Sequence, residues 1–143
     1  MLDSIIGPVE IAYILDLLLA MALGFAIGAE RESRGKDAGI STHTLVIVGA
    51  MLFTFMSMTF DPASKSRVAA QVVSGIGFLG AGLIIKEGAT VRNLTTAASL
   101  WSAGAIGMAI GFGYSAIATI SAVAMLVIPR IPHLGKKLER SEE

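Results

Sequence analysis

Long apolar segments separated by short charged ones dominate the chain. Four apolar regions stand out, at residues 11–29, 44–60, 68–85 and 94–128. The last holds 35 residues without a charge, and as one helix it would run about 52 Å, against a hydrocarbon core of about 30 Å. Gly111 and Gly113 allow a tight turn near its middle, which divides it into 94–110 and 113–128. The pattern therefore predicts five transmembrane helices.

The composition agrees with this pattern. Hydrophobic residues make up 54% of the chain and charged residues 15%, whereas about 25% of the residues in a soluble domain are charged. The N-terminal residues lack a basic region ahead of the first apolar run, so no cleaved signal peptide is expected. We predict an all-α integral membrane protein: one compact transmembrane domain over residues 1–143, with a short basic tail at 130–143.

The distribution of Lys and Arg predicts the orientation, because basic residues are retained on the cytoplasmic side. If the N-terminus is outside, nine basic residues are cytoplasmic and only Lys65 and Arg67 are external. The prediction is an external N-terminus and a cytoplasmic C-terminus.

Several function classes are disfavoured. The formal net charge is zero, which argues against nucleic-acid binding. There are no cysteines, so thiol chemistry is excluded, and His43 and His133 are too far apart to suggest a metal site. The stretch GIGFLG at 75–80 fits a dinucleotide fingerprint but lacks the acidic residue about 20 positions later. No enzymatic constellation is present, and no cofactor is expected.

Small residues spaced about four apart predict where helices pack closely. One such stripe lies on each of the first, third and fourth spans: Ala20, Gly24 and Gly28; Ser74, Gly77 and Ala81; Ser99, Ala103, Gly107 and Gly111. Because glycines are concentrated between 75 and 113, we expect the third and fourth spans to be central. The second span is rich in bulky Met and Phe, which suits a lipid-facing or subunit-facing position. These stripes also predict a homo-oligomer, most simply a dimer.

Asp16 is the one formally charged residue inside a span. Because it shares a side of its helix with Ala20, we expect it to face a neighbouring helix rather than lipid. An ionisable group at that depth marks an ion or proton path, a structural pair or a point of water entry, although Asp16 also lies near enough to the outer interface to be solvated. It is the one candidate metal ligand. Polar residues of the later spans predict bonds between helices or, alternatively, a hydrophilic path: Gln71, Ser74, Thr95, Thr96, Ser99 and Ser102.

The loop between the first two spans, residues 30–43, carries six charges in its first eight residues. Glu30 and Arg31 directly follow the small-residue stripe of the first span. We expect them to form a salt bridge to the loop at 86–93 on the same side of the membrane, which makes this pair of loops the best candidate for regulatory contacts.

Three stretches resemble the membrane domain of the MgtC/SapB family: LGFAIGAERESR, KDAGISTHTLVIVGA, and the long segment that contains VSGIGFLGAG and LTTAASLW. The resemblance runs from about Leu15 to Gly113. It implies a multi-pass protein of a prokaryotic plasma membrane, associated with growth under magnesium limitation and, in pathogens, with intracellular survival. The matching motif positions are Gly28, Glu30, Arg31, Gly39, Thr42, Gln71, Gly75, Gly77, Gly80, Gly82, Arg92, Thr95, Thr96 and Trp101.

The resemblance also implies a regulator that binds other membrane proteins, including the F-type ATP synthase. Two positions depart from the family pattern: Ser41 stands where Arg is frequent, and Asn93 stands where Gly is usual. Longer members carry a soluble C-terminal domain, whereas this chain stops after its basic tail. The alternative is a transporter or channel for Mg²⁺ or another ion, with Asp16 on the path. Mg²⁺ is thus left open as a ligand or a signal, although a single carboxylate is a poor ligand set for it.

Overall fold

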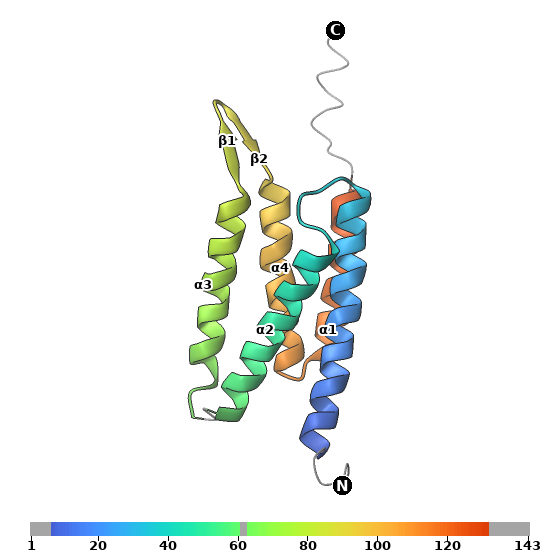
Figure 1. The fold of residues 1–143 in the computed structure, drawn as a ribbon, viewed down its shortest axis with the longest axis vertical. Helices are drawn as coiled ribbons and strands as arrows, with labels where there is room; N and C mark the ends of the chain where they lie inside the picture. The colour runs from blue at the N-terminus through green and yellow to red at the C-terminus, as the bar shows by residue number, and fades with distance from the viewer. Residues whose placement is uncertain (1–6, 61–62, 132–143) are drawn as a thin grey trace.

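Five α-helices and one β-hairpin make up the computed structural model of the protein, which describes residues 7–60 and 63–131. The helices run alternately up and down (Figure 1). In chain order they are α1 (Pro8–Ser33), α2 (Ile40–Phe60), α3 (Lys65–Leu83), α4 (Leu94–Gly111) and α5 (Ser115–Val127). The first four are long and apolar enough to cross a membrane, and α5 is shorter. The predicted helical membrane bundle is confirmed to this extent, and its orientation stays a prediction.

The turn predicted inside the long apolar region is present. α4 ends at Gly111, and Gly113 adopts a left-handed backbone with φ of +82°. This conformation lets the amide of Tyr114 donate a hydrogen bond of 2.8 Å to the carbonyl of Ala109. A residue without a Cβ adopts that φ at little cost, so the glycine separates the two helices. At the far end, α5 runs into the 3-10 helix η2 (Ile128–Arg130), which contains Pro129; Pro132 lies outside the described residues.

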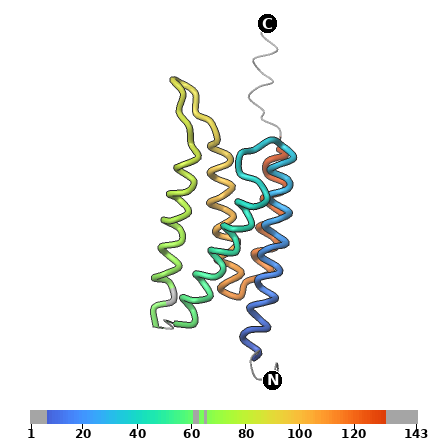
Figure 2. The backbone as a smooth tube through the Cα atoms, in the orientation of Figure 1, coloured from blue at the N-terminus to red at the C-terminus, as the bar shows by residue number. Residues whose placement is uncertain are grey.

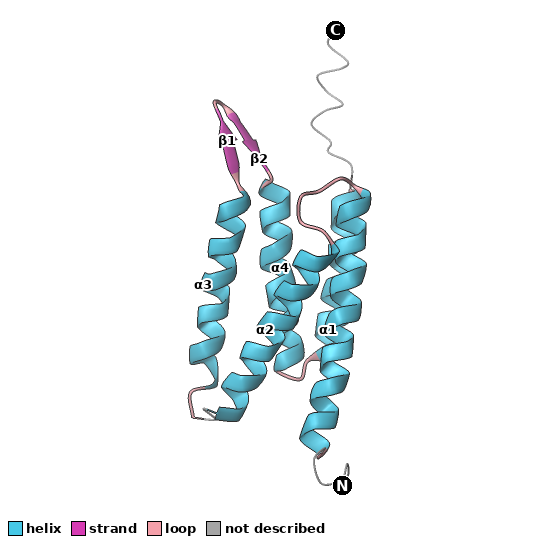
Figure 3. Ribbon diagram, in the orientation of Figure 1, coloured by secondary structure: helices cyan, strands magenta, loops and turns pink. Residues whose placement is uncertain are grey.

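The loop expected after the third span is a β-hairpin. β1 (Ile85–Glu87) pairs antiparallel with β2 (Thr90–Arg92), and Glu87 lies opposite Thr90. Gly88, with φ of +60°, occupies the first position of the two-residue turn, where glycine favours tight hairpins. The hairpin extends beyond the helices, at the end of the bundle where α3 finishes (Figure 3).

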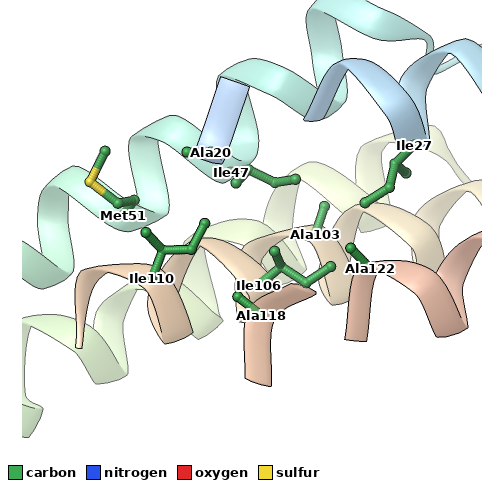
Figure 4. Packing of buried hydrophobic residues seen from close by; sticks show 9 residues of the cluster. All are labelled: Ala20, Ile27, Ile47, Met51, Ala103, Ile106, Ile110, Ala118 and Ala122. Atoms are coloured by element: carbon green, nitrogen blue, oxygen red, sulfur yellow. The ribbon is translucent and has the colours of Figure 1, made fainter. Parts of the chain in front are cut away.

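The core lies between α1, α2, α4 and α5. Figure 4 shows its nine fully packed side chains, all from these four helices: Ala20, Ile27, Ile47, Met51, Ala103, Ile106, Ile110, Ala118 and Ala122. α2 packs against α1 and α4 and also contacts α3. α4 in turn contacts all four other helices. The two central helices are therefore α2 and α4, which confirms the expectation for the fourth span.

Two expectations about packing were wrong. The second span was expected at the periphery because of its bulky residues, yet it is central, since one seam of the helix is buried: His43, Ile47, Ala50, Met51, Thr54 and Ser57. Phe53 and Met56 point outward instead. The third span was expected to be central, but α3 stands at the edge of the bundle (Figure 2). Of its described side chains, it buries only Ala69 and Ile76 together with Gly80.

Two of the three small-residue stripes are packed against α2, and the third is exposed. On α1, a Cβ added to Gly24 would lie 2.9 Å from the Thr44 hydroxyl oxygen, and on α4 a Cβ at Gly107 would overlap the Ile47 carbonyl. These two stripes pack against α2, as close helix approach requires. On α3, by contrast, a Cβ at Gly75 or Gly77 would have no atom within 4 Å. The third stripe is left open by the bundle.

Candidate polar site at one end of the bundle

Buried charged residues gather where α1 ends. Glu30 is 8% exposed and Arg31 is 3% exposed, although both lie in the last turn of a helix. Their burial follows from the glycines before them: Gly28 packs directly on the backbone of Ile40, which brings α2 against the end of α1. A buried charge is costly unless it is paired, so the partners of these two residues define the chemistry of this end.

Glu30 has a partner on its own helix. Its carboxylate forms an ion pair with Arg34, one turn later. The Arg34 guanidinium also donates a hydrogen bond of 2.8 Å from Nη1 to the carbonyl of Pro129. Arg34 thus connects the end of α1 to the end of α5.

His43 joins α2 to α4 within the same region. Its side chain is fully buried, with Nδ1 3.0 Å from the Gly39 carbonyl and Nε2 3.1 Å from Ser99 Oγ. Because a carbonyl only accepts, Nδ1 carries the proton, and Nε2 of the neutral ring then accepts a hydrogen bond from the Ser99 hydroxyl. Ser99 Oγ also lies 2.8 Å from the carbonyl of Thr96, an alternative acceptor for the same hydrogen.

The role of His43 was not predicted. From the sequence the residue was considered only as a possible metal ligand and rejected, whereas it is the first member of the buried α2 seam. The available signal was its spacing, since Ile47, Ala50 and Thr54 follow it at intervals of three and four residues. That register places an imidazole among core residues, where it needs hydrogen-bond partners.

Arg31 is a second buried charge at this end, and like Oε2 of Glu30 it has atoms without a hydrogen-bond partner. Its Nε and Nη2 atoms have no hydrogen-bond partner, and neither does the buried hydroxyl of Thr96. Arg31 lines a pocket of about 260 Å³ between α1, α4 and the end of α5, together with Thr95, Ser99, Ser102, Met125 and Ile128. The arrangement offers the Arg31 guanidinium and the Thr95 hydroxyl to an outside acceptor, since the hydroxyls of Ser99 and Ser102 already donate within the bundle.

The motif positions named from the sequence fall into three groups. One set belongs to this polar end or supports it: Gly28, Glu30, Arg31, Gly39 and Thr96, together with Thr95 at the rim of the pocket. Gly80 is a packing position, because it lies against Ala97 of α4. The remaining positions are exposed on the bundle: Thr42, Gln71, Gly75, Gly77, Gly82, Arg92 and Trp101.

The predicted salt bridge between the loops was wrong. Glu30 pairs with Arg34, and Arg31 is buried away from the hairpin, because both belong to the packed end of α1. The two connections are nevertheless joined by a different pair. Asn93 donates a hydrogen bond of 2.6 Å from Nδ2 to Oδ2 of Asp37.

Asp16 lies far along α1 from this polar end. It is half-buried, and its Oδ1 accepts a hydrogen bond of 3.4 Å from Ser115 Oγ, at the start of α5. The prediction that Asp16 faces a neighbouring helix is thus confirmed. Across the residues that the structure describes, no group of three or more His, Asp or Glu side chains is placed to hold a metal ion.

Comparison with known proteins gives a consistent result. Residues 17–137 match the MgtC family. Protein MgtC of Salmonella typhimurium strain LT2 is 56% identical over 101 residues, which cover 71% of this chain and 44% of that protein. Protein MgtC of Brucella abortus strain 2308 is 50% identical over 115 residues, which cover 78% of this chain and 48% of that protein. The match thus spans less than half of each relative. No solved structure matches the chain significantly.

Proposed function

Because the chain belongs to the MgtC family, we propose that it is a non-catalytic protein of a prokaryotic plasma membrane that acts by binding and regulating other membrane proteins. The process it serves is adaptation to magnesium limitation, as the family resemblance implies. Since the curated relatives are more than twice the length of the match, this activity is proposed for the part of the family that the chain represents.

The outer face of α3 is the observation that carries this proposal. Ser74, Gly77 and Ala81 are all exposed on α3, and no atom lies within 4 Å of a Cβ built on Gly77. In lipid, helices associate through close backbone approach at such small residues, because there is little hydrophobic force between them. The bundle thus presents an unused helix-packing face to the membrane.

A groove beside this face widens the surface. It lies between α2 and α3, has a volume of about 470 Å³, and is lined by apolar residues together with Gly49, Gly75 and Gln71. The candidate partners are a second copy of this chain, giving a dimer, and other membrane proteins such as the F-type ATP synthase. Both fit a mode of action that depends on contact between helices.

Photo-crosslinking in native membranes tests the proposal. A photoreactive residue at Ser74 should give one reproducible adduct, identified by mass spectrometry as this chain or another membrane protein, whereas one at Leu18 on the exposed face of α1 should not. G77L should abolish the adduct and growth at low Mg²⁺ while leaving the thermal midpoint of the purified protein unchanged. Labelling that is equal at both positions and indifferent to G77L would argue against this face.

Ion transport is separated from regulation by a flux measurement. Proteoliposomes that contain only this protein should take up no more Mg²⁺ than empty vesicles, and D16N should not change the rate. Robust uptake that D16N abolishes would replace the regulator with a transporter, because Asp16 is the one carboxylate in the interior of a span.

A further inference from the structure

We propose that the pocket between α1, α4 and the end of α5 binds a phosphate group, and that the Arg31 guanidinium is its principal ligand. This proposal is independent of the partner-binding face on α3. Three features of the pocket support phosphate binding: the unfilled donors of Arg31, the charge around them, and the residues that form the pocket walls.

The unfilled donors have a specific geometry. Nε and Nη2 of Arg31 are buried and lack hydrogen-bond partners. These two atoms form the edge of the guanidinium that grips two oxygens of a phosphate or carboxylate at once. A buried guanidinium left unpaired carries a desolvation penalty of several kcal/mol, so an acceptor at this edge would stabilise the protein.

The local charge favours an anion. Glu30 and Arg34 are the two charged groups that act electrostatically on Arg31. Glu30 is already paired with Arg34, and as the neighbour of Arg31 in a helix it points in a different direction. One carboxylate against two guanidinium groups leaves a net charge of +1, which an anion would balance.

The pocket walls match a phosphate that carries an apolar chain. Thr95 offers its hydroxyl on one wall, beside Ser99 and Ser102, whose hydroxyls donate within the bundle. Met125 and Ile128 supply an apolar wall. The site lies at the ends of α1 and α5, which is the depth of lipid headgroups, and basic pockets between transmembrane helices bind such groups. The phosphate is therefore that of an anionic phospholipid or a free phosphate ion.

Ligand-dependent thermal stability of the full chain in mild detergent distinguishes these sources. The probes are phosphatidylglycerol, diacylglycerol, which lacks the phosphate, and sodium phosphate at constant ionic strength. We expect phosphatidylglycerol to raise the thermal midpoint in a saturable way and diacylglycerol to leave it unchanged. A similar response to sodium phosphate would show that the free ion suffices, and none would assign the site to the lipid.

Variants test the role of Arg31. R31Q should abolish the rise in thermal midpoint with phosphatidylglycerol. R31K keeps the positive charge but lacks the paired N–H donors of the guanidinium, so it should weaken the apparent affinity for phosphatidylglycerol about tenfold. T95V should also weaken it, so the test survives if R31Q does not fold. R92Q, on the exposed hairpin, is the matched control and should respond like the wild type. An absence of response to both phosphate probes, or an unchanged response in R31K and T95V, would overturn the proposal.

Discussion

Single glycines decide how closely the helices approach α2. Gly107 of α4 lies against the Ile47 carbonyl, and a Cβ there would also stand 2.9 Å from the Cβ of Ala50. Backbone atoms cannot move aside as a flexible side chain does. Replacement by alanine therefore forces α4 away from α2, even though alanine is the better helix former.

We accordingly expect G107A to lower the stability of the bundle by about 1–3 kcal/mol. The matched control is G82A on α3, where no atom lies within 4 Å of the new Cβ and helix propensity alone acts, in the stabilising direction, by about 1 kcal/mol. Thermal unfolding followed by circular dichroism in one detergent compares them. A midpoint for G107A equal to that of G82A would show that α4 is not held against α2 in this way.

The buried histidine gives a second prediction for a single residue. S99A removes the group that His43 Nε2 contacts at 3.1 Å and leaves a buried ring nitrogen without a partner, at a cost of about 1–3 kcal/mol. S102A is the control, because the Ser102 hydroxyl bonds to Ala98 in its own helix. Chemical denaturation should separate the two variants, and equal midpoints would contradict a link between α2 and α4 through His43.

At the scale of elements, the hairpin depends on Asn93. This residue adopts φ of +64° and holds the base of β2 to Asp37 in the loop after α1. N93G removes only the hydrogen bond, whereas N93A also adds left-handed strain of about 1–2 kcal/mol. Hydrogen exchange at 85–93 should thus be faster in N93G than in the wild type and fastest in N93A. If N93G and N93A exchange alike, backbone strain at this position does not control the hairpin.

The sequence predicts the positions of the helices along the chain well, but it predicts less well which helices pack against one another. Hydropathy and the Gly111–Gly113 turn locate all five helices, because lipid demands long apolar segments. The central position of α2 depends on one narrow row of buried residues along that helix. On α2, bulky Phe53 and Met56 conceal a buried register that begins at His43. On α3, all the glycines except Gly80 face outward. Small residues predict a packing face, but not whether the partner belongs to the same chain.

The polar end was predictable only in part. Glu30 and Arg31 stand out in the sequence as charges beside a small-residue stripe, and the structure buries both at the end of α1. Their contacts were not, because the predicted loop-to-loop salt bridge ignored how deeply Gly28 draws the end of α1 against α2. The partner residues Arg34 and Ser99 come from segments whose proximity only the fold creates.

For the whole molecule, the arrangement of helices makes the orientation testable. The start of α1 and the start of α3 lie at one end of the bundle, and the ends of α1 and α5 lie at the other (Figure 1). The chain has no cysteine, so single cysteines at Ser4, Ser66, Ser33 and Ser141 can report on it. In intact cells, an impermeant reagent should label only the first two. Labelling of the position 141 variant from outside would reverse the predicted orientation or change the number of crossings.

The short fifth helix has a consequence for the surrounding bilayer. α5 has 13 residues, so with the 3-10 turn that follows it measures about 26 Å, whereas the 26 residues of α1 measure about 39 Å. Lipids beside α5 must thin to cover it, which costs a fraction of a kcal/mol for each Å of hydrophobic mismatch. At the Ser115 end of α5, where the Ser115 hydroxyl bonds to Asp16, such thinning would bring interfacial water close to the Asp16 carboxylate. The protein should accordingly be more stable in vesicles of short-chain lipids and should partition into the thinner regions of a membrane.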